Sequence, residues 1–425
     1  MTKKAGFPIS PHILVAGGGT AGCAAAIAAA RRGHSVLLVE ESNSLGGVST
    51  SGGVNEWFAS LEGLGDIFCR VKTELDRFGA RFGRFFNGEY LKIVWQLLAE
   101  EAGVDVLFHT SLVSADVSDG RVARAGLVSC SQSFDVEARY FVDATGEGDL
   151  AALAGARFMQ GHPESGRTLH MSLTCILQDT GKPVTPYLPT GLEEITGPED
   201  FPGLHGHTRL PDGRVYCNMT KVMGHDPTDP VSLSEAEREA RLQLVRMVHY
   251  LQRTGYPTHA LCATGAKIGI REGRRIVGDY VLTEADITGD APRDFADGVT
   301  VATSQIDFHS LTKPGHVGWR QRVEPYAIPF RCLVAKGFQN LLMAGKCISG
   351  DQVAHSSYRM TPTCCAMGQA AGTAAALAVE GRLRDIRDVR VAALRAELAA
   401  GGMELDPTKH QAFAPEITPD PTRGA

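Results

Sequence analysis

The glycine spacing Gly17-x-Gly19-x-x-Gly22 constrains the fold of this chain more than any other feature. An apolar run at residues 12–16 precedes it and an alanine-rich stretch at residues 23–32 follows it, as in a strand, a tight turn and a helix. In such a turn the first glycine permits the reversal, the second lets a pyrophosphate approach the backbone, and the third lets the helix pack closely. The helix N-terminus adds free N–H groups and the positive end of the helix dipole. The pattern therefore predicts a dinucleotide-binding unit.

A second apolar run, residues 35–39, ends at Glu40. Two buried strands joined by a crossover helix form a βαβ unit. A carboxylate at the end of the second strand accepts hydrogen bonds from ribose hydroxyls, and it repels a 2′-phosphate. Glu40 therefore disfavours NADP as the nucleotide at this site.

Two further glycine-rich segments suit the same ligand. Residues 44–53 hold four glycines and four hydroxyl side chains, which can wrap an extended anion with backbone and hydroxyl donors. Residues 134–142 predict one strand, which runs into a tight turn that ends near residue 149. In a parallel sheet this turn lies at the carboxyl edge, so we expect it beside the first glycine turn.

The composition narrows the classes of partner. With 42 Lys+Arg against 48 Asp+Glu, the net charge of −6 provides no basic field, which disfavours nucleic acid and anionic membrane surfaces. No segment approaches the ~20 consecutive apolar residues of a membrane span. The ten cysteines include no CxxC spacing, and the histidines form no ligand cluster, so no metal site is predicted. We expect reduced thiols in a cytoplasmic protein.

Together these motifs resemble the glutathione-reductase-like flavoproteins, and most closely the FAD-dependent oxidoreductase family. The resemblance rests on GGGTAG (17–22) with Glu40, LGGVSTSGG (45–53), DATGEGD (143–149), REGRRIVGDYVLT (271–283) and the long motif at 344–378, in this order over residues 12–380. It implies an α/β fold: a Rossmann-like FAD-binding domain of the glutathione-reductase/p-hydroxybenzoate-hydroxylase type, with an inserted mixed β/α substrate domain. The implied cofactor is FAD.

The resemblance also implies where an extended FAD lies. It places the adenosine at Glu40 and near Leu112-Val113, and the pyrophosphate at the first glycine turn. It places the ribityl chain at residues 345–351 and the flavin ring at the start of the helix near residue 363. The small residues of that helix suit close packing against another helix equally well, and both roles can hold. The expected cofactor-binding residues are Gly17, Gly19, Thr20, Ala21, Gly22, Glu40, Gly46, Gly47, Ser49, Thr50, Val113, Ala144, Thr145, Gly146, Asp149, Gly345, Lys346, Gly350, Asp351, Gly368 and Gln369.

Two absences in the sequence favour an organic substrate as the electron donor. The CxxxxC spacing of flavin disulfide reductases is missing from residues 46–53, and no second GxGxxG turn is available for a nicotinamide nucleotide. The candidate catalytic residues are His355 as proton acceptor, with Arg359 and Arg331 as ligands for a substrate carboxylate. Arg271, with its neighbours in the REGRR motif, is interpreted as part of an ion-pair network that bridges domains rather than as a substrate site. His309 is interpreted as a surface-loop histidine, with a place in a lid as the alternative.

The domain division follows from where the nucleotide-binding pattern stops and resumes. We expect the FAD-binding domain at residues 12–153 and 335–400, an inserted substrate module at 154–334, and a tail at 401–425. A strongly amphipathic helix at residues 234–252 belongs to the module.

Three functions remain open at this level. The first is a dehydrogenase or oxidase that moves a hydride from a small organic substrate to flavin N5. The second is a flavin monooxygenase that uses reduced nicotinamide and O₂, and the third is a flavin-binding subunit without turnover. The sequence does not distinguish O₂ from another electron acceptor, and a homodimer is compatible with it.

Overall fold

The computed structural model describes residues 10–203, 206–289, 294–315 and 318–413. Its centre is a five-stranded parallel sheet in the order β20-β9-β1-β2-β5. The strands are β20 (Leu341–Met343), β9 (Tyr140–Asp143), β1 (Ile13–Ala16), β2 (Val36–Val39) and β5 (Asp105–Leu107). Every residue of the first four is buried, as expected for a parallel sheet covered on both faces. The α/β class and the Rossmann-like unit are therefore confirmed.

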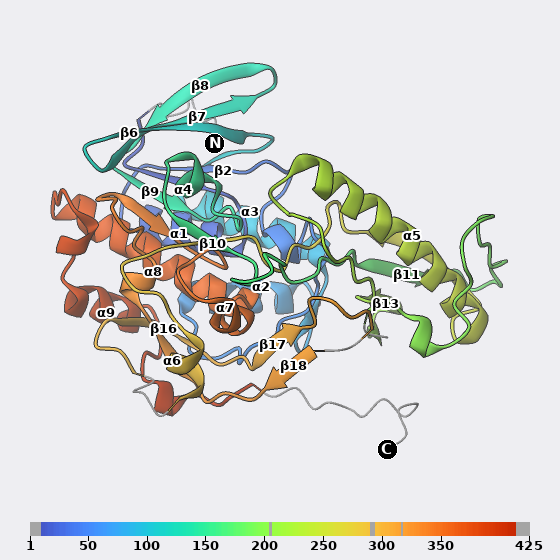
Figure 1. Cartoon of the computed structure of the whole chain (residues 1–425). Coiled ribbons are helices and arrows are strands. Elements are labelled where there is room, and N and C mark those ends of the chain that lie inside the picture. The colour runs from blue at the N-terminus through green and yellow to red at the C-terminus, as the bar shows by residue number, and fades with distance from the viewer. Residues whose placement is uncertain (1–9, 204–205, 290–293, 316–317, 414–425) are drawn as a thin grey trace.

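Helix α1 (Thr20–Ala30) connects β1 with β2 and completes the predicted βαβ unit. Its eleven residues are all buried, because it packs against the sheet and against α8 (Thr361–Glu380). The two helices lie side by side in Figure 1. The surrounding helices are α2 (Asp66–Arg77), α3 (Gly88–Ala102) and α9 (Val391–Ala400).

An antiparallel sheet interrupts the parallel one in sequence. It comprises β6 (Ser111–Ser118), β7 (Arg121–Ser129) and β8 (Gln132–Glu137), and Figure 1 shows it at the top of the molecule. The sequence predicted one strand over residues 134–142, whereas the structure divides that run between β8 and β9. The two halves differ in burial, since β8 is mostly exposed and β9 is entirely buried.

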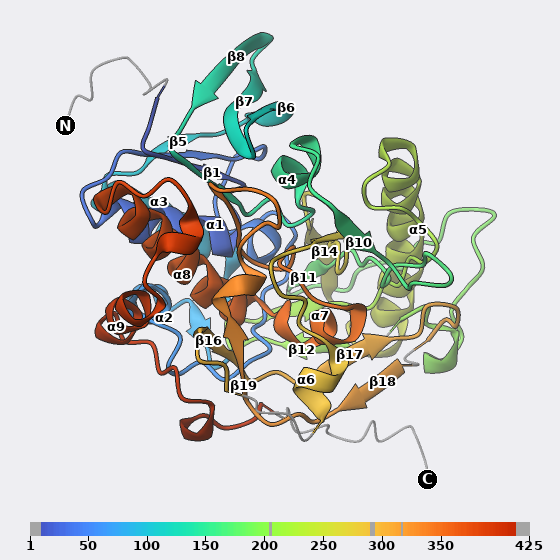
Figure 2. The ribbon, with the colours of Figure 1, turned by 60° about the vertical axis from the view of Figure 1, so that its left-hand side comes forward.

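A second unit lies on one side of the molecule. Its antiparallel sheet has the order β12-β13-β11-β14, and the long helix α5 (Pro230–Thr254) packs beside it. Figures 1 and 2 both show α5 on the side opposite α9. The strands are β11 (Cys175–Asp179), β12 (His207–Arg209), β13 (Arg214–Cys217) and β14 (His259–Thr264).

Four strand pairs and three short α-helices are added to these units. The pairs are β3 (Arg81–Phe82) with β4 (Phe85–Phe86), β10 (Phe158–Gln160) with β15 (Arg274–Ile276), β16 (Gly298–Ala302) with β19 (Tyr326–Pro329), and β17 (Ile306–His309) with β18 (Gly318–Gln321). The helices are α4 (Asp149–Leu153), α6 (Glu284–Thr288) and α7 (Gln352–Tyr358).

Buried apolar side chains form two cores, and they bear on the proposed domain division. The smaller core contains residues between Met171 and Ile268 only. Side chains from Ile276 onward, including those of β16 and β19, join the core of the parallel sheet. The last part of the predicted module, 154–334, thus shares the core of the FAD-binding unit.

The predicted tail, 401–425, begins inside the folded body. Met403 and Leu405 are buried in the larger core, and Phe413 donates its backbone N–H to the Thr303 carbonyl oxygen at 2.8 Å. Residues 414–425 lie outside the described residues. Among the helices of the described chain, none combines the length and apolar character needed to cross a membrane.

Candidate functional site

A cavity of about 630 Å³ follows the carboxyl edge of the parallel sheet. Much of its lining comes from the residues directly after four strands: 17–21 after β1, 40–41 after β2, 144–147 after β9 and 344–346 after β20. Ligands of open α/β folds bind at this edge. The volume lies within the ~300–1,000 Å³ usual for small-molecule and cofactor sites.

The first glycine turn is shaped by contacts that allow no side chain at two of its positions. Gly17 has a φ of +92°, and a Cβ there would lie 2.5 Å from the Ala144 carbonyl oxygen. A Cβ on Gly22 would lie 1.8 Å from the Gly17 carbonyl oxygen. A Cβ on Gly19 would come no closer than 4.0 Å to its neighbours, because this position faces the cavity. Gly19 is the N-cap of α1 and provides no side-chain cap, so N–H groups of the first turn face an open space.

Glu40 joins this turn to the next strand. Its Oε2 accepts a hydrogen bond from the Gly18 N–H at 2.7 Å, and its Oε1 accepts one from the Ser42 N–H at 2.8 Å. Each carboxylate oxygen can accept a further bond. Glu40 therefore holds the glycine turn and still lines the cavity.

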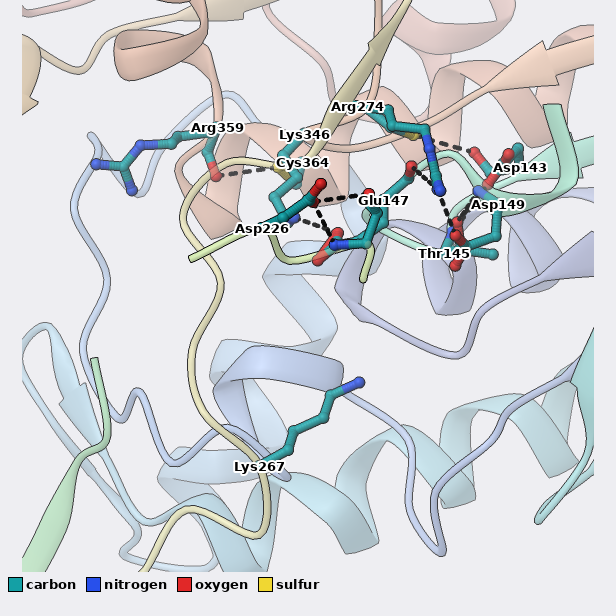
Figure 3. Close-up of polar contacts among 12 residues, drawn as sticks. Asp143, Thr145, Glu147, Asp149, Asp226, Lys267, Arg274, Lys346, Arg359 and Cys364 are labelled. Atoms are coloured by element: carbon teal, nitrogen blue, oxygen red, sulfur yellow. Dashed lines mark hydrogen bonds and ion pairs between the residues drawn. The ribbon is translucent and has the colours of Figure 1, made fainter. Parts of the chain in front are cut away.

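Charged side chains on the other wall are paired with one another. Lys346 forms an ion pair with Glu147, and Arg274 donates to Asp149 at 2.8 Å. Figure 3 shows these pairs in one group, with Lys267 on a separate segment. Next to this group the buried Asp143 carboxylate accepts hydrogen bonds from Thr145 and from the Ala151 N–H, which fixes the turn after β9.

Twelve of the predicted cofactor-binding residues meet in this cavity. They are Gly17, Gly19, Thr20, Ala21, Glu40, Gly47, Ala144, Thr145, Gly146, Asp149, Gly345 and Lys346. Nine others lie outside its lining, namely Gly22, Gly46, Ser49, Thr50, Val113, Gly350, Asp351, Gly368 and Gln369.

Several of these nine have structural roles. Asp351 caps α7 by accepting from the Ala354 N–H at 2.8 Å. A Cβ on Gly368 would lie 2.0 Å from the Ala21 carbonyl oxygen, so this glycine serves the packing of α8 on α1. Gln369 donates to Asp66 at 2.8 Å, and Val113 points outward with half of its surface exposed. The part of α8 at the cavity is its start, where Thr361 and Cys364 line it.

Comparison with known proteins identifies this arrangement. A model of the family described as FAD dependent oxidoreductase matches residues 12–398. The chain belongs to this family. FAD is its cofactor and it is an oxidoreductase, as the resemblance of its motifs implied. The open position at Gly19 and the cavity that continues from Glu40 to Lys346 fit an extended dinucleotide.

The individual proteins that match this FAD dependent oxidoreductase have low sequence identity to it. The chain is 29% identical over 163 residues to a digeranylgeranylglycerophospholipid reductase of Methanoculleus marisnigri, a match of 34% of this chain that spans only 40% of that relative's length. Among solved structures, a geranylgeranyl bacteriochlorophyll reductase-like protein of Thermoplasma acidophilum matches at 12% identity and a TM-score of 0.48, over 94% of this chain and 93% of that one. The anhydrotetracycline hydroxylase OxyS of Streptomyces rimosus matches at 13% identity and a TM-score of 0.44, over 94% and 70%.

A second cavity of the FAD dependent oxidoreductase, about 200 Å³ in volume, adjoins the first. The two share the lining residues Val48, Gly269, Ile270, Lys346, Arg359 and Thr361. The second cavity lies between the parallel-sheet unit and the smaller unit, and its polar lining includes His170, Lys221, Arg271, Asp307, His309 and Arg359.

Asp307 organises one wall of this second cavity. Its carboxylate accepts from His309 Nε2 at 3.0 Å, from Arg359 at 2.9 Å and from Arg320 at 3.1 Å. Burial lowers the pKa of His309 to about 4 against the opposing effect of Asp307, so its imidazole is neutral near pH 7. His309 and the two arginines are thus held in fixed positions.

The facing wall carries residues that the sequence did not single out for substrate. Arg271 Nη1 donates to Ser172 Oγ at 2.7 Å and to the His170 carbonyl oxygen at 3.3 Å. His170 is 5% exposed, and its ring lies edge-on to His309 at 4.5 Å between centroids. Burial, followed by the charge of Arg271, holds the pKa of His170 well below its usual value. Within the described chain, its Nδ1 has no hydrogen-bond partner.

The three predicted catalytic residues are separated by the fold. Only Arg359 lines the cavities. His355 is fully buried in α7 with its ring edge-on to Tyr358, and Arg331 forms an ion pair with Asp297 at 2.9 Å on a half-exposed surface. The REGRR arginines separate as well: Arg275 pairs with the buried Glu272 and Arg274 with Asp149, while Arg271 lies in the second cavity.

A buried carboxyl group in the second cavity predicts how stability depends on pH. Burial raises the pKa of Glu56 from 4.5 to about 7, against the opposing charge of Arg84. The folded chain therefore retains a proton that the unfolded chain releases, and the free energy of unfolding falls as pH rises from about 4.5 to about 7. In a Glu56→Gln variant, the unfolding free energy should fall by on the order of 3 kcal/mol less over this pH range than in the wild type. Urea unfolding at several pH values measures the difference.

The comparison must be between wild type and variant, because the pKa of Asp143 is also raised by burial, to about 6, and contributes a slope of the same sign. Glu62→Gln is the matched control, since that side chain is 85% exposed. Equal slopes for wild type and Glu56→Gln would contradict the prediction.

Proposed function

We propose that this protein oxidises a small organic molecule bound in the second cavity and transfers its electrons to FAD in the first. The observation that supports this most is the shared wall of the two cavities, which contains Val48, Ile270 and Thr361. A molecule in the second cavity lies next to the start of α8, where the flavin ring is expected. FAD supplies the two-electron acceptor when bound, by taking a hydride at N5.

His170 is the proposed proton acceptor. Oxidation of an alcohol or amine releases a proton from oxygen or nitrogen as the hydride leaves carbon, so a neutral base must lie near that atom. The imidazole of His170 lines the second cavity, and its lowered pKa keeps it neutral near pH 7. Its Nδ1 is buried and lacks a partner among the described residues, so no hydrogen bond to this atom holds the ring in its charged form.

Arg359 is the proposed positioning residue between the two ligands. It lines both cavities, and its bond to Asp307 restrains the guanidinium group. The apolar side chains of Val48, Ile270 and Met360, at the shared wall or next to it, restrict water there, which favours hydride transfer over side reactions.

The experiment is anaerobic reduction of the purified FAD-loaded protein. The loss of flavin absorbance measures the reduction. Small alcohols, amines and hydroxy acids are added one at a time, and NADH and NADPH are tested separately. Bleaching by an organic substrate alone supports the proposal, and product mass identifies the oxidised bond. Bleaching by a reduced nicotinamide alone would instead favour a monooxygenase or a reductase, and bleaching by none of these compounds would favour a flavin-binding subunit.

A further inference from the structure

The second cavity carries more positive charge than its own acidic residues compensate. Its lining includes five cationic side chains, Lys221, Arg271, Arg320, Lys346 and Arg359, and two acidic ones, Glu56 and Asp307. Lys346 is compensated by Glu147, while Arg320 and Arg359 share Asp307. Glu56 is paired at 2.9 Å with Arg84, which lies outside the lining.

Arg271 and Lys221 are left without a carboxylate. In the described part of the chain, no acidic side chain lies within ion-pair distance of either one. Lys221 is 2% exposed. Its Nζ donates to the carbonyl oxygens of Lys313 at 2.7 Å and Gly315 at 3.1 Å. An uncompensated buried cation is costly, and an anionic ligand would remove that cost.

The geometry of Arg271 indicates how such a ligand would bind. Its two hydrogen bonds both use Nη1, so Nε and Nη2 have no partner among the described residues. These two donors form one edge of the planar guanidinium group, and such an edge matches the two oxygens of a carboxylate. Ser172 and the His170 carbonyl oxygen hold the opposite side of the group in place.

We propose that the second cavity binds the carboxylate of a small carboxylic acid, with Arg271 as its bidentate ligand and Lys221 as a second cation. That this acid is also the substrate rests on the function proposed above. The volume of about 200 Å³ suits a compact acid, whose carbon atoms could contact lining residues such as Val48, Phe58 and Met360.

The oxidation balances with the residues present. The carbon beside the carboxylate carries a hydroxyl or amino group and one hydrogen. That hydrogen leaves with two electrons as a hydride to FAD, and the O–H or N–H proton passes to His170 as the C=O or C=N bond forms. The substrate loses two hydrogens, FAD gains the hydride, and His170 gains the proton.

Isothermal titration of the FAD-loaded protein tests the anion site without requiring turnover. The probes are glycolate, malonate, succinate and benzoate, each compared with its neutral amide, and inorganic phosphate. At least one carboxylate should bind, and its amide should bind at least tenfold more weakly. Arg271→Gln should weaken the carboxylate at least tenfold, whereas Arg124→Gln, an exposed arginine on β7, should leave it unchanged.

The outcomes separate this inference from the proposed function. Equal binding of acid and amide, phosphate binding alone, or unchanged affinity in a folded Arg271→Gln variant would overturn the anion site. If Arg271→Gln does not fold, the acid-to-amide ratio of the wild type decides. Carboxylates that bind but never bleach the flavin would support the anion site and refute the oxidation. Bleaching by a neutral alcohol, together with no binding of any carboxylate, would support the oxidation and refute the anion site.

Discussion

A Gly19→Leu variant should fold normally and lose at least a hundredfold in FAD affinity, about 2.8 kcal/mol. Gly19 has φ −65° and ψ 177°, a conformation open to any residue, so leucine introduces no backbone strain. A Cβ there comes no closer than 4.0 Å to the neighbouring atoms, because the position faces the first cavity. The leucine side chain would occupy the space at the N-terminus of α1 where the pyrophosphate is expected. The ratio of flavin to protein absorbance after purification measures the effect.

Gly255→Leu is the matched control for this prediction. Gly255 also has open space where a Cβ would lie and a negative φ, −151°, but it ends α5 in the second unit. The control should keep its FAD, and both variants should unfold at the temperature of the FAD-free wild type once the cofactor is removed. Full FAD content in Gly19→Leu would refute the proposed path of the cofactor.

A Gly372→Ala variant should lose about 3 kcal/mol of unfolding free energy, the upper end of the usual cost of overpacking. Alanine is the better helix former by about 1 kcal/mol, so propensity alone predicts the opposite sign. A Cβ at this position, however, would lie 2.1 Å from the Ala25 carbonyl oxygen of α1. The obstacle is backbone in a buried helix, which no rotamer change can move aside. Urea unfolding followed by circular dichroism gives the difference.

Gly255→Ala provides the control for this second variant, because it adds the same methyl group in open space. Its unfolding free energy should stay within about 0.5 kcal/mol of wild type. If Gly372→Ala were as stable as the control, the contact between α1 and α8 would have to be looser than the structure shows.

Local patterns predicted the parallel-sheet unit well. The glycine turn, the apolar runs and Glu40 lie close together in sequence, so β1, α1 and β2 could be recognised without knowledge of the rest of the chain. The strand at residues 134–142 was harder, because its apolar and polar residues alternate only in the first half. The break between β8 and β9 depends on which sheet each half joins, which is a property of the tertiary structure.

The second cavity could not be predicted in the same way. His170, Arg271 and Asp307 are far apart in sequence, and each belongs to a different segment of the fold. The role of an arginine depends on which carboxylate it reaches, and neighbouring arginines of one motif have different partners here: Glu272 for Arg275 and Asp149 for Arg274. His170 and Ser172 are polar residues that alternate with the apolar residues 169, 171 and 173, which is a signal that both face the same side. Nothing in the local sequence connects them with Arg271.

The order of elements along the chain has a consequence for synthesis on the ribosome. Helix α1 acquires its partner α8 only after roughly 330 further residues have been translated, and β20 joins the parallel sheet shortly before α8. At ~5–20 residues per second, this interval lasts roughly 15 to 70 seconds. Throughout it a helix that is wholly buried in the finished fold lacks the helix it packs against. The first cavity also gains residues 344–346 and the start of α8 only late in translation, so we expect exposed apolar surface on the nascent chain and FAD binding near the end of synthesis.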